Sequence, residues 1–80
     1  MDLWQAVKQG LIVKVFFPSS TPGGPISGEY LRVKVLTVDP ITSENSTFSG
    51  EVLDTPTTKL PVKAGEHVML AVSRVEEIFP

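Results

Sequence analysis

Residues 29–38 read EYLRVKVLTV, and this stretch decides the fold class. Apolar and polar side chains alternate along it, as they do on a strand with one buried face and one solvated face. The apolar set is Leu31, Val33 and Val35, and the polar set is Tyr30, Arg32 and Lys34. The alternation predicts a strand in an antiparallel sheet.

A second strand is predicted at residues 11–17, LIVKVFF, which are rich in β-branched and aromatic types. Alternation places Leu11, Val13, Val15 and Phe17 on one face and Ile12, Lys14 and Phe16 on the other. Because both faces carry large apolar groups, we expect both to be covered. The N-terminal helix or a second subunit would supply the second cover.

Two further strands are predicted nearer the C-terminus, at residues 47–53 (TFSGEVL) and 67–72 (HVMLAV). Gly50 interrupts the first of them, which indicates a bulge, a bend or a close backbone approach. A short extended segment is expected at residues 59–62.

Helical structure is predicted only at the two ends of the chain. Residues 2–9 form a short helix, capped by Asp2 and ended by Gly10, within an N-terminal segment 1–10. Leu3, Ala6 and Val7 share its inner face, and the helix must pack on the rest of the domain. At the other end, Ser73 and Glu76 have capping-box spacing and predict a helical turn over residues 74–79 that turns Val75, Ile78 and Phe79 to the core.

The segment 18–28 (PSSTPGGPISG) holds three prolines and three glycines and predicts a long flexible loop. The whole pattern is that of one all-β domain spanning residues 1–80. We expect a small, strongly bent antiparallel sheet or SH3-like barrel of four to five strands, because such a shape buries a compact core and leaves few free edges.

Composition excludes several classes of protein. The chain has 80 residues and no cysteine, which rules out disulfides and thiolate metal sites. Seven basic residues face nine acidic ones, a net charge of −2 that lacks the broad attraction of a nucleic-acid binder. No apolar run approaches the roughly 20 residues of a membrane span. We expect a cytoplasmic protein without a membrane contact.

The sequence offers little for catalysis. His67 is the single histidine, and one histidine without cysteine does not make a structural zinc site. We therefore expect no enzyme activity, no catalytic residue, no metal and no cofactor. An enzyme or ligand binder centred on His67 and the 18–28 loop stays open as an alternative.

Apolar and aromatic groups on predicted outer surfaces favour a non-catalytic module for protein interaction or oligomerisation, including a homodimer. The expected contact residues are Trp4, Ile12, Phe16, Tyr30, Arg32 and Lys34. Trp4 is either a core residue or an interface anchor. Tyr30, Arg32 and Lys34 share a face that also suits stacking and phosphate contact, so a small barrel that binds single-stranded nucleic acid is the alternative function.

Several segments in order resemble an uncharacterised bacterial family of small β-domains. They are GEYLRVKV (28–35), FSGEVLDTP (48–56), Leu60 with GEHV (65–68), and VEEI (75–78). These segments resemble four motifs of the family, in the same order: G-E-x-x-W-V-x-V, F-x-G-x-L-x-N-x-P, G-D-x-V and I-x-D-W. Arg32 stands where that family often has Trp, and Phe79 stands near its terminal Trp. The resemblance implies an SH3-like β-domain and no activity.

Overall fold

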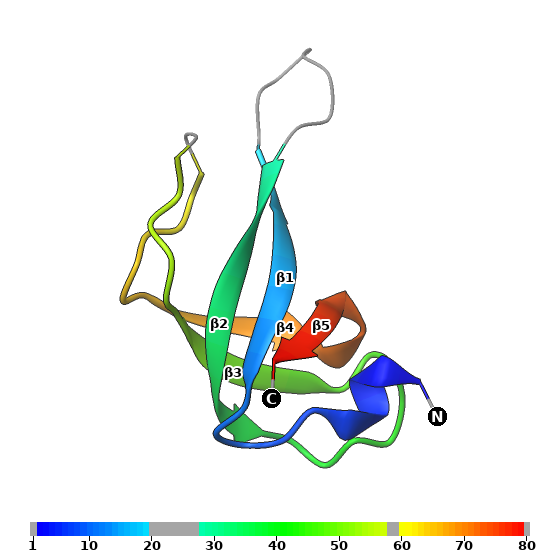
Figure 1. Ribbon diagram of the computed structural model, residues 1–80. Coiled ribbons are helices and arrows are strands. Elements are labelled where there is room, and N and C mark those ends of the chain that lie inside the picture. Colours follow the sequence, from blue (N-terminus) through cyan, green and yellow to red (C-terminus); the bar gives the residue numbers. More distant parts are fainter. Residues whose placement is uncertain (1, 20–27, 58–59, 80) are drawn as a thin grey trace.

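The computed structural model describes residues 2–19, 28–57 and 60–79. Within these ranges, five strands form one antiparallel sheet in the order β4-β3-β2-β1-β5 (Figure 1). The strands are β1 (Ile12–Pro18), β2 (Gly28–Val38), β3 (Thr47–Val52), β4 (His67–Ala71) and β5 (Val75–Phe79). Two short 3-10 helices are also present, η1 (Leu3–Ala6) and η2 (Val72–Arg74). The prediction of a small all-β fold is confirmed.

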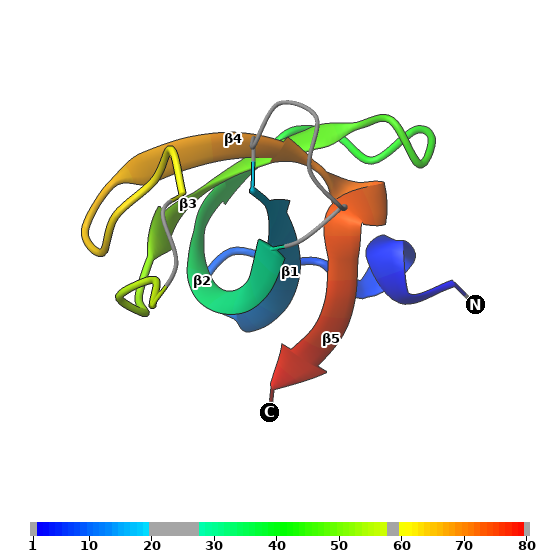
Figure 2. The same cartoon turned by 90° about the horizontal axis from the view of Figure 1, so that it is seen from above.

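The sheet turns at β2, the longest strand. Residues 28–34 of β2 pair with β1, whereas residues 33–38 pair with β3. The pairing with β3 also shifts register between Val35 and Thr37. Because its two neighbours flank different halves, the β1–β2 hairpin stands across β3 and β4 in Figure 1. Seen from above, the strands curl around one side of the sheet (Figure 2).

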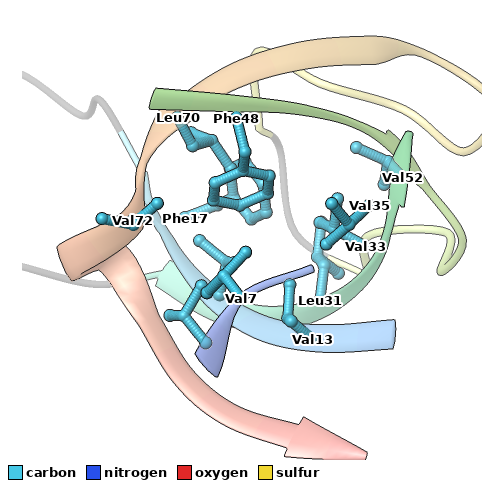
Figure 3. Close-up of a cluster of buried hydrophobic side chains, with 12 residues drawn as sticks. Val7, Val13, Phe17, Leu31, Val33, Val35, Phe48, Val52, Leu70 and Val72 are labelled. Atoms are coloured by element: carbon cyan, nitrogen blue, oxygen red, sulfur yellow. The ribbon is translucent and has the colours of Figure 1, made fainter. Parts of the chain in front are cut away.

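The enclosed side of the sheet holds the hydrophobic core. Alternate residues of β1 and β2 point into it, as their sequences predict, and the side chains of Val13, Val15 and Val33 have no exposed surface. Figure 3 shows groups from separate strands meeting there. The buried apolar residues are Val7, Val13, Val15, Phe17, Leu31, Val33, Val35, Phe48, Val52, Leu70, Val72 and Val75.

Gly50 lies where β3 crosses close to β2. It is buried and pairs with Val35, and a β-carbon at this position would lie 2.7 Å from the carbonyl oxygen of Lys34 and would also collide with Cγ1 of Val33. The predicted close backbone approach is therefore confirmed. Glycine at this position allows β3 to pair closely with β2 where the sheet bends.

The prediction of a helix over residues 2–9 is wrong in length and type. Only Leu3–Ala6 is helical, as a 3-10 helix, and Leu3 is 41% exposed whereas Val7 is buried. Val7 follows the helix in an extended conformation. A helix this short has little stability of its own, and the next residues join the sheet instead. Gly10 N–H donates to Val35 O at 2.8 Å.

The predicted C-terminal helical turn over residues 74–79 is also wrong. Residues 75–79 form β5, which pairs antiparallel with β1, and the helical residues before it are Val72–Arg74. Ser73 and Glu76 make no capping box, because Glu76 already lies in the strand. The open edge of β1 explains the outcome. Pairing with it satisfies backbone groups on both strands, which outweighs a single turn of helix.

Two predicted segments fall partly outside the described ranges. For the predicted loop 18–28 these are residues 20–27, and for the predicted segment 59–62 this is residue 59. Leu60 and Val62 are not in a strand, but both pack against the core. Among the residues that the structure describes, no helix is long and apolar enough to cross a membrane.

Gly50→Ala tests the close crossing of β2 and β3. In an ordinary strand this change would add stability, because alanine restricts the unfolded chain. Here the added methyl meets Val33 and a backbone oxygen, so we expect the free energy of unfolding to fall by about 1–3 kcal/mol. Urea unfolding measures it, with Lys63→Ala in the exposed segment before β4 as the control. Equal or greater stability of Gly50→Ala would contradict this crossing.

Candidate interaction surface

The outward side chains of the β1–β2 hairpin form one continuous surface, here called the hairpin face. Its residues lie in three cross-strand pairs, Ile12 with Lys34, Lys14 with Arg32, and Phe16 with Tyr30. Five of the six contact residues predicted from the sequence therefore lie together, and Lys14 joins them. Alternation along both strands places these groups outward, because intervening residues such as Val13, Val15 and Val33 point into the core.

Two aromatic rings lie at the end of the hairpin face that is nearest to Pro18 and Gly28. The rings of Phe16 and Tyr30 meet edge to face, with 5.2 Å between centroids and 63° between planes. Tyr30 is 53% exposed, and Phe16 is half-buried. Gly28 leaves room for this arrangement, because a β-carbon there would lie 2.7 Å from Cζ of Phe16. The pair offers a rigid aromatic contact with a polar hydroxyl at its tip.

Lys14 lies between an aromatic ring and a carboxylate. Its Nζ is 4.9 Å from the centroid of the Tyr30 ring and 3.7 Å from Oε1 of Glu77 on β5. The ammonium group thus contacts the ring face electrostatically while its charge is balanced by Glu77. Both contacts hold Tyr30 and Lys14 in a defined arrangement on the surface.

Arg32 forms the strongest ion pair of the hairpin face. Its Nη2 donates to Oδ1 of Asp54 at 2.8 Å, its Nε donates to the same oxygen at 3.0 Å, and its backbone N–H donates to Oδ2 at 2.9 Å. Hydrogen bonding to Arg32 holds the pKa of Asp54 below its ordinary value, although partial burial opposes this. Because Asp54 lies two residues after the end of β3, the pair ties the start of the next loop to β2.

The same loop has a second attachment to β2. The backbone N–H of Thr57 donates to Oε1 of Glu29 at 3.0 Å, near the beginning of β2. Asp54 and Thr57 therefore hold residues 54–57 alongside the hairpin. These bonds fix one border of the hairpin face.

Charges on the hairpin face are balanced locally. Lys14 faces Glu77, Arg32 binds Asp54, and Lys34 pairs with Glu51 in the register of β2 and β3. Lys14 and Arg32 therefore each have a carboxylate as an ion-pair partner, and Lys34 has one as its cross-strand neighbour. The surface is amphipathic without a net field, which distinguishes it from the positive groove of a nucleic-acid-binding protein.

Trp4, the sixth predicted contact residue, is placed elsewhere. It is partly buried and packs against the hydrophobic core, and η1 lies against β5 and η2. The helix therefore does not provide the expected second cover of residues 11–17. Side chains of the neighbouring strands surround that face instead, since Ile12 pairs with Phe79 and Phe16 with Tyr30. Arg74 also reaches β1, where its Nη2 donates to Phe16 O at 2.6 Å.

His67 begins β4 and is exposed, with Glu51 as its cross-strand neighbour. It lies on the far side of β3 from the aromatic pair, so the sheet does not bring it to the hairpin face. Among the described residues, no three histidine or acidic side chains gather as metal ligands would. The hydroxyl residues 20, 21 and 27 of the predicted loop lie outside the described ranges.

Sequence reasoning missed the anionic partners of this surface, Asp54 and Glu77. Asp54 lies outside every predicted strand, and only the pairing of β3 with β2 brings it within reach of Arg32. Glu77 lies in the segment predicted as a helical turn, so no cross-strand partner is predicted for it. A prediction that paired the C-terminal residues with β1 would have found it opposite Lys14.

No family model matches this chain, and no curated protein or solved structure is significantly similar to it. The resemblance to the uncharacterised bacterial β-domain family stays a prediction from its motifs. Function is therefore inferred from the residues and contacts of the hairpin face.

Asp54→Asn tests the ion pair through its pH dependence. Because the folded-state pKa of Asp54 is lowered, the stability that its ionised form contributes is complete above the ordinary pKa of aspartate. It is lost as the pH falls through the folded-state pKa. We expect wild type to unfold at a higher urea concentration than Asp54→Asn at pH 7, and the difference to vanish in acid. A difference that stays constant with pH, or one matched by the exposed-loop control Glu44→Gln, would contradict this role.

Proposed function

We propose that this protein is a small SH3-like barrel that acts as a non-catalytic protein-interaction module. The proposed barrel is supported by the sheet order β4-β3-β2-β1-β5, by the curl of the strands and by the 3-10 helix between β4 and β5. Non-catalytic action is supported by the exposed position of His67, away from the aromatic pair. A partner protein would contact the hairpin face.

One observation carries the proposal, an ordered aromatic pair on the same face of the hairpin as two ion pairs. Interfaces between proteins favour tyrosine, phenylalanine and arginine at their centre and a polar rim. Tyr30, Phe16 and Arg32 match that composition, and each is held by a neighbour before any partner arrives. A contact surface that is already rigid loses little conformational entropy on binding.

Charge matching disfavours the alternative function, binding of single-stranded nucleic acid. A phosphate group would have to compete with Asp54 for Arg32 and with Glu77 for Lys14. The affinity of such proteins comes largely from phosphate contacts that release counterions. A protein partner can instead use the same ion pairs without breaking them.

Tyr30→Ser tests the hairpin face directly. The side chain is half-exposed and outside the core, so the variant should fold. We expect a partner retained by immobilised wild-type protein to be lost with Tyr30→Ser and kept with the exposed control Lys63→Ser. Affinity should fall roughly 10–100-fold, as for a central interface aromatic. Equal retention by all three proteins would contradict the proposal.

A labelled single-stranded oligonucleotide distinguishes the alternative function. In a fluorescence anisotropy titration at low salt, where phosphate contacts are strongest, we expect no binding. Salt-sensitive binding that is lost in Tyr30→Ser would favour the nucleic-acid function instead.

A further inference from the structure

Within the described ranges, strand β4 lies at one end of the sheet and pairs only with β3. The hydrogen bonds at both ends of this ladder fix its phase. Val52 N–H donates to Glu66 O at 2.9 Å, and Val72 N–H donates to Ser46 O at 2.7 Å. Antiparallel ladders alternate between bonded and non-bonded pairs, so residues 66, 68, 70 and 72 direct their peptide groups to β3. The peptide groups of His67, Met69 and Ala71 therefore face away from the sheet.

This edge lacks the features that normally prevent strand pairing. β4 reads HVMLA, with no charged residue and no proline, and its register with β3 runs without a bulge. Met69 at its centre is 72% exposed, more than any other large apolar side chain described. The opposite edge strand, β5, carries the exposed residues Glu76 and Glu77. Proteins usually protect edge strands with such charges, and here only one edge is protected.

We propose that β4 pairs with β4 of a second copy of this chain, antiparallel and about a two-fold axis at Met69. Met69 would then lie opposite the partner's Met69, and His67 opposite the partner's Ala71. The outward peptide groups of these three residues match those of the copy under this symmetry, as a two-fold interface requires. The two sheets become continuous across the axis.

Charge and symmetry favour a second copy over a foreign strand. β4 presents no charge that would select an acidic or basic partner strand, and pairing with itself brings no like charges opposite each other. The two methionine side chains meet on the outer face, where each now contacts solvent. A single strand pair buries less than the standard interface of about 1,200–2,000 Å², so the dimer is weak and depends on concentration.

Sedimentation velocity of the full chain from about 10 μM to about 1 mM tests this dimer. We expect wild type to associate, Met69→Lys to associate at least about tenfold more weakly because lysine blocks edges, and Met69→Leu to associate as wild type does. Folding of each variant is checked by amide chemical-shift dispersion. Wild type that stays monomeric over the whole range would overturn the proposal.

Amide hydrogen exchange identifies the surface. In wild type, protection of the outward N–H groups of Met69 and Ala71 should rise with concentration, and it should not rise in Met69→Lys. Tyr30→Ser separates this proposal from the proposed function, because the β4 dimer should persist in that variant. A dimer that Tyr30→Ser abolishes and Met69→Lys leaves intact would assign self-association to the hairpin face and refute pairing through β4.

Discussion

The fold depends on one sheet packing its apolar face against itself. No second sheet and no long helix is available among the described residues to cover that face, so strands distant in the sheet order must supply the contacts. β2 makes this geometry by pairing with β1 along one half and with β3 along the other. Gly50 allows the strands to cross closely at the turn. The curl also decides which side chains are enclosed in the core and which point outward.

The curl also determines the surface chemistry. Along β1 and β2 the buried residues alternate with less buried ones. The buried side chains point into the core, and the intervening side chains form the hairpin face. Their neighbours are set by strand register, so Lys14 meets Glu77 and Arg32 meets Asp54. An interaction surface of ordered, charge-matched groups is thus a direct product of the same pairing that builds the core. The unprotected edge of β4 has a different origin, because β4 is the last strand at one end of the sheet.

Much of this fold could be predicted from the sequence, because strand periodicity is a local signal. The alternation of residues 29–38 gave the buried and exposed sets of β2, and Gly50 indicated the close crossing. The C-terminal strand could not be predicted in this way. Ser73 and Glu76 have the spacing of a helix cap, and only the distant edge of β1 overrides that local preference. Likewise, the partners of Lys14 and Arg32 depend on long-range register, which periodicity does not specify.

Contacts between β1 and β4 test the central claim most directly. In a flat sheet these strands would be separated by β2 and β3, roughly 14 Å apart at 4.7–4.9 Å per step. In the curled sheet the ring of Phe17 and the side chain of Leu70 belong to one core (Figure 3). We expect nuclear Overhauser cross-peaks between the Phe17 ring protons and the Leu70 methyl groups in the wild-type protein. Their absence, with the β1–β2 and β3–β4 ladder cross-peaks present, would show an open sheet and contradict the account.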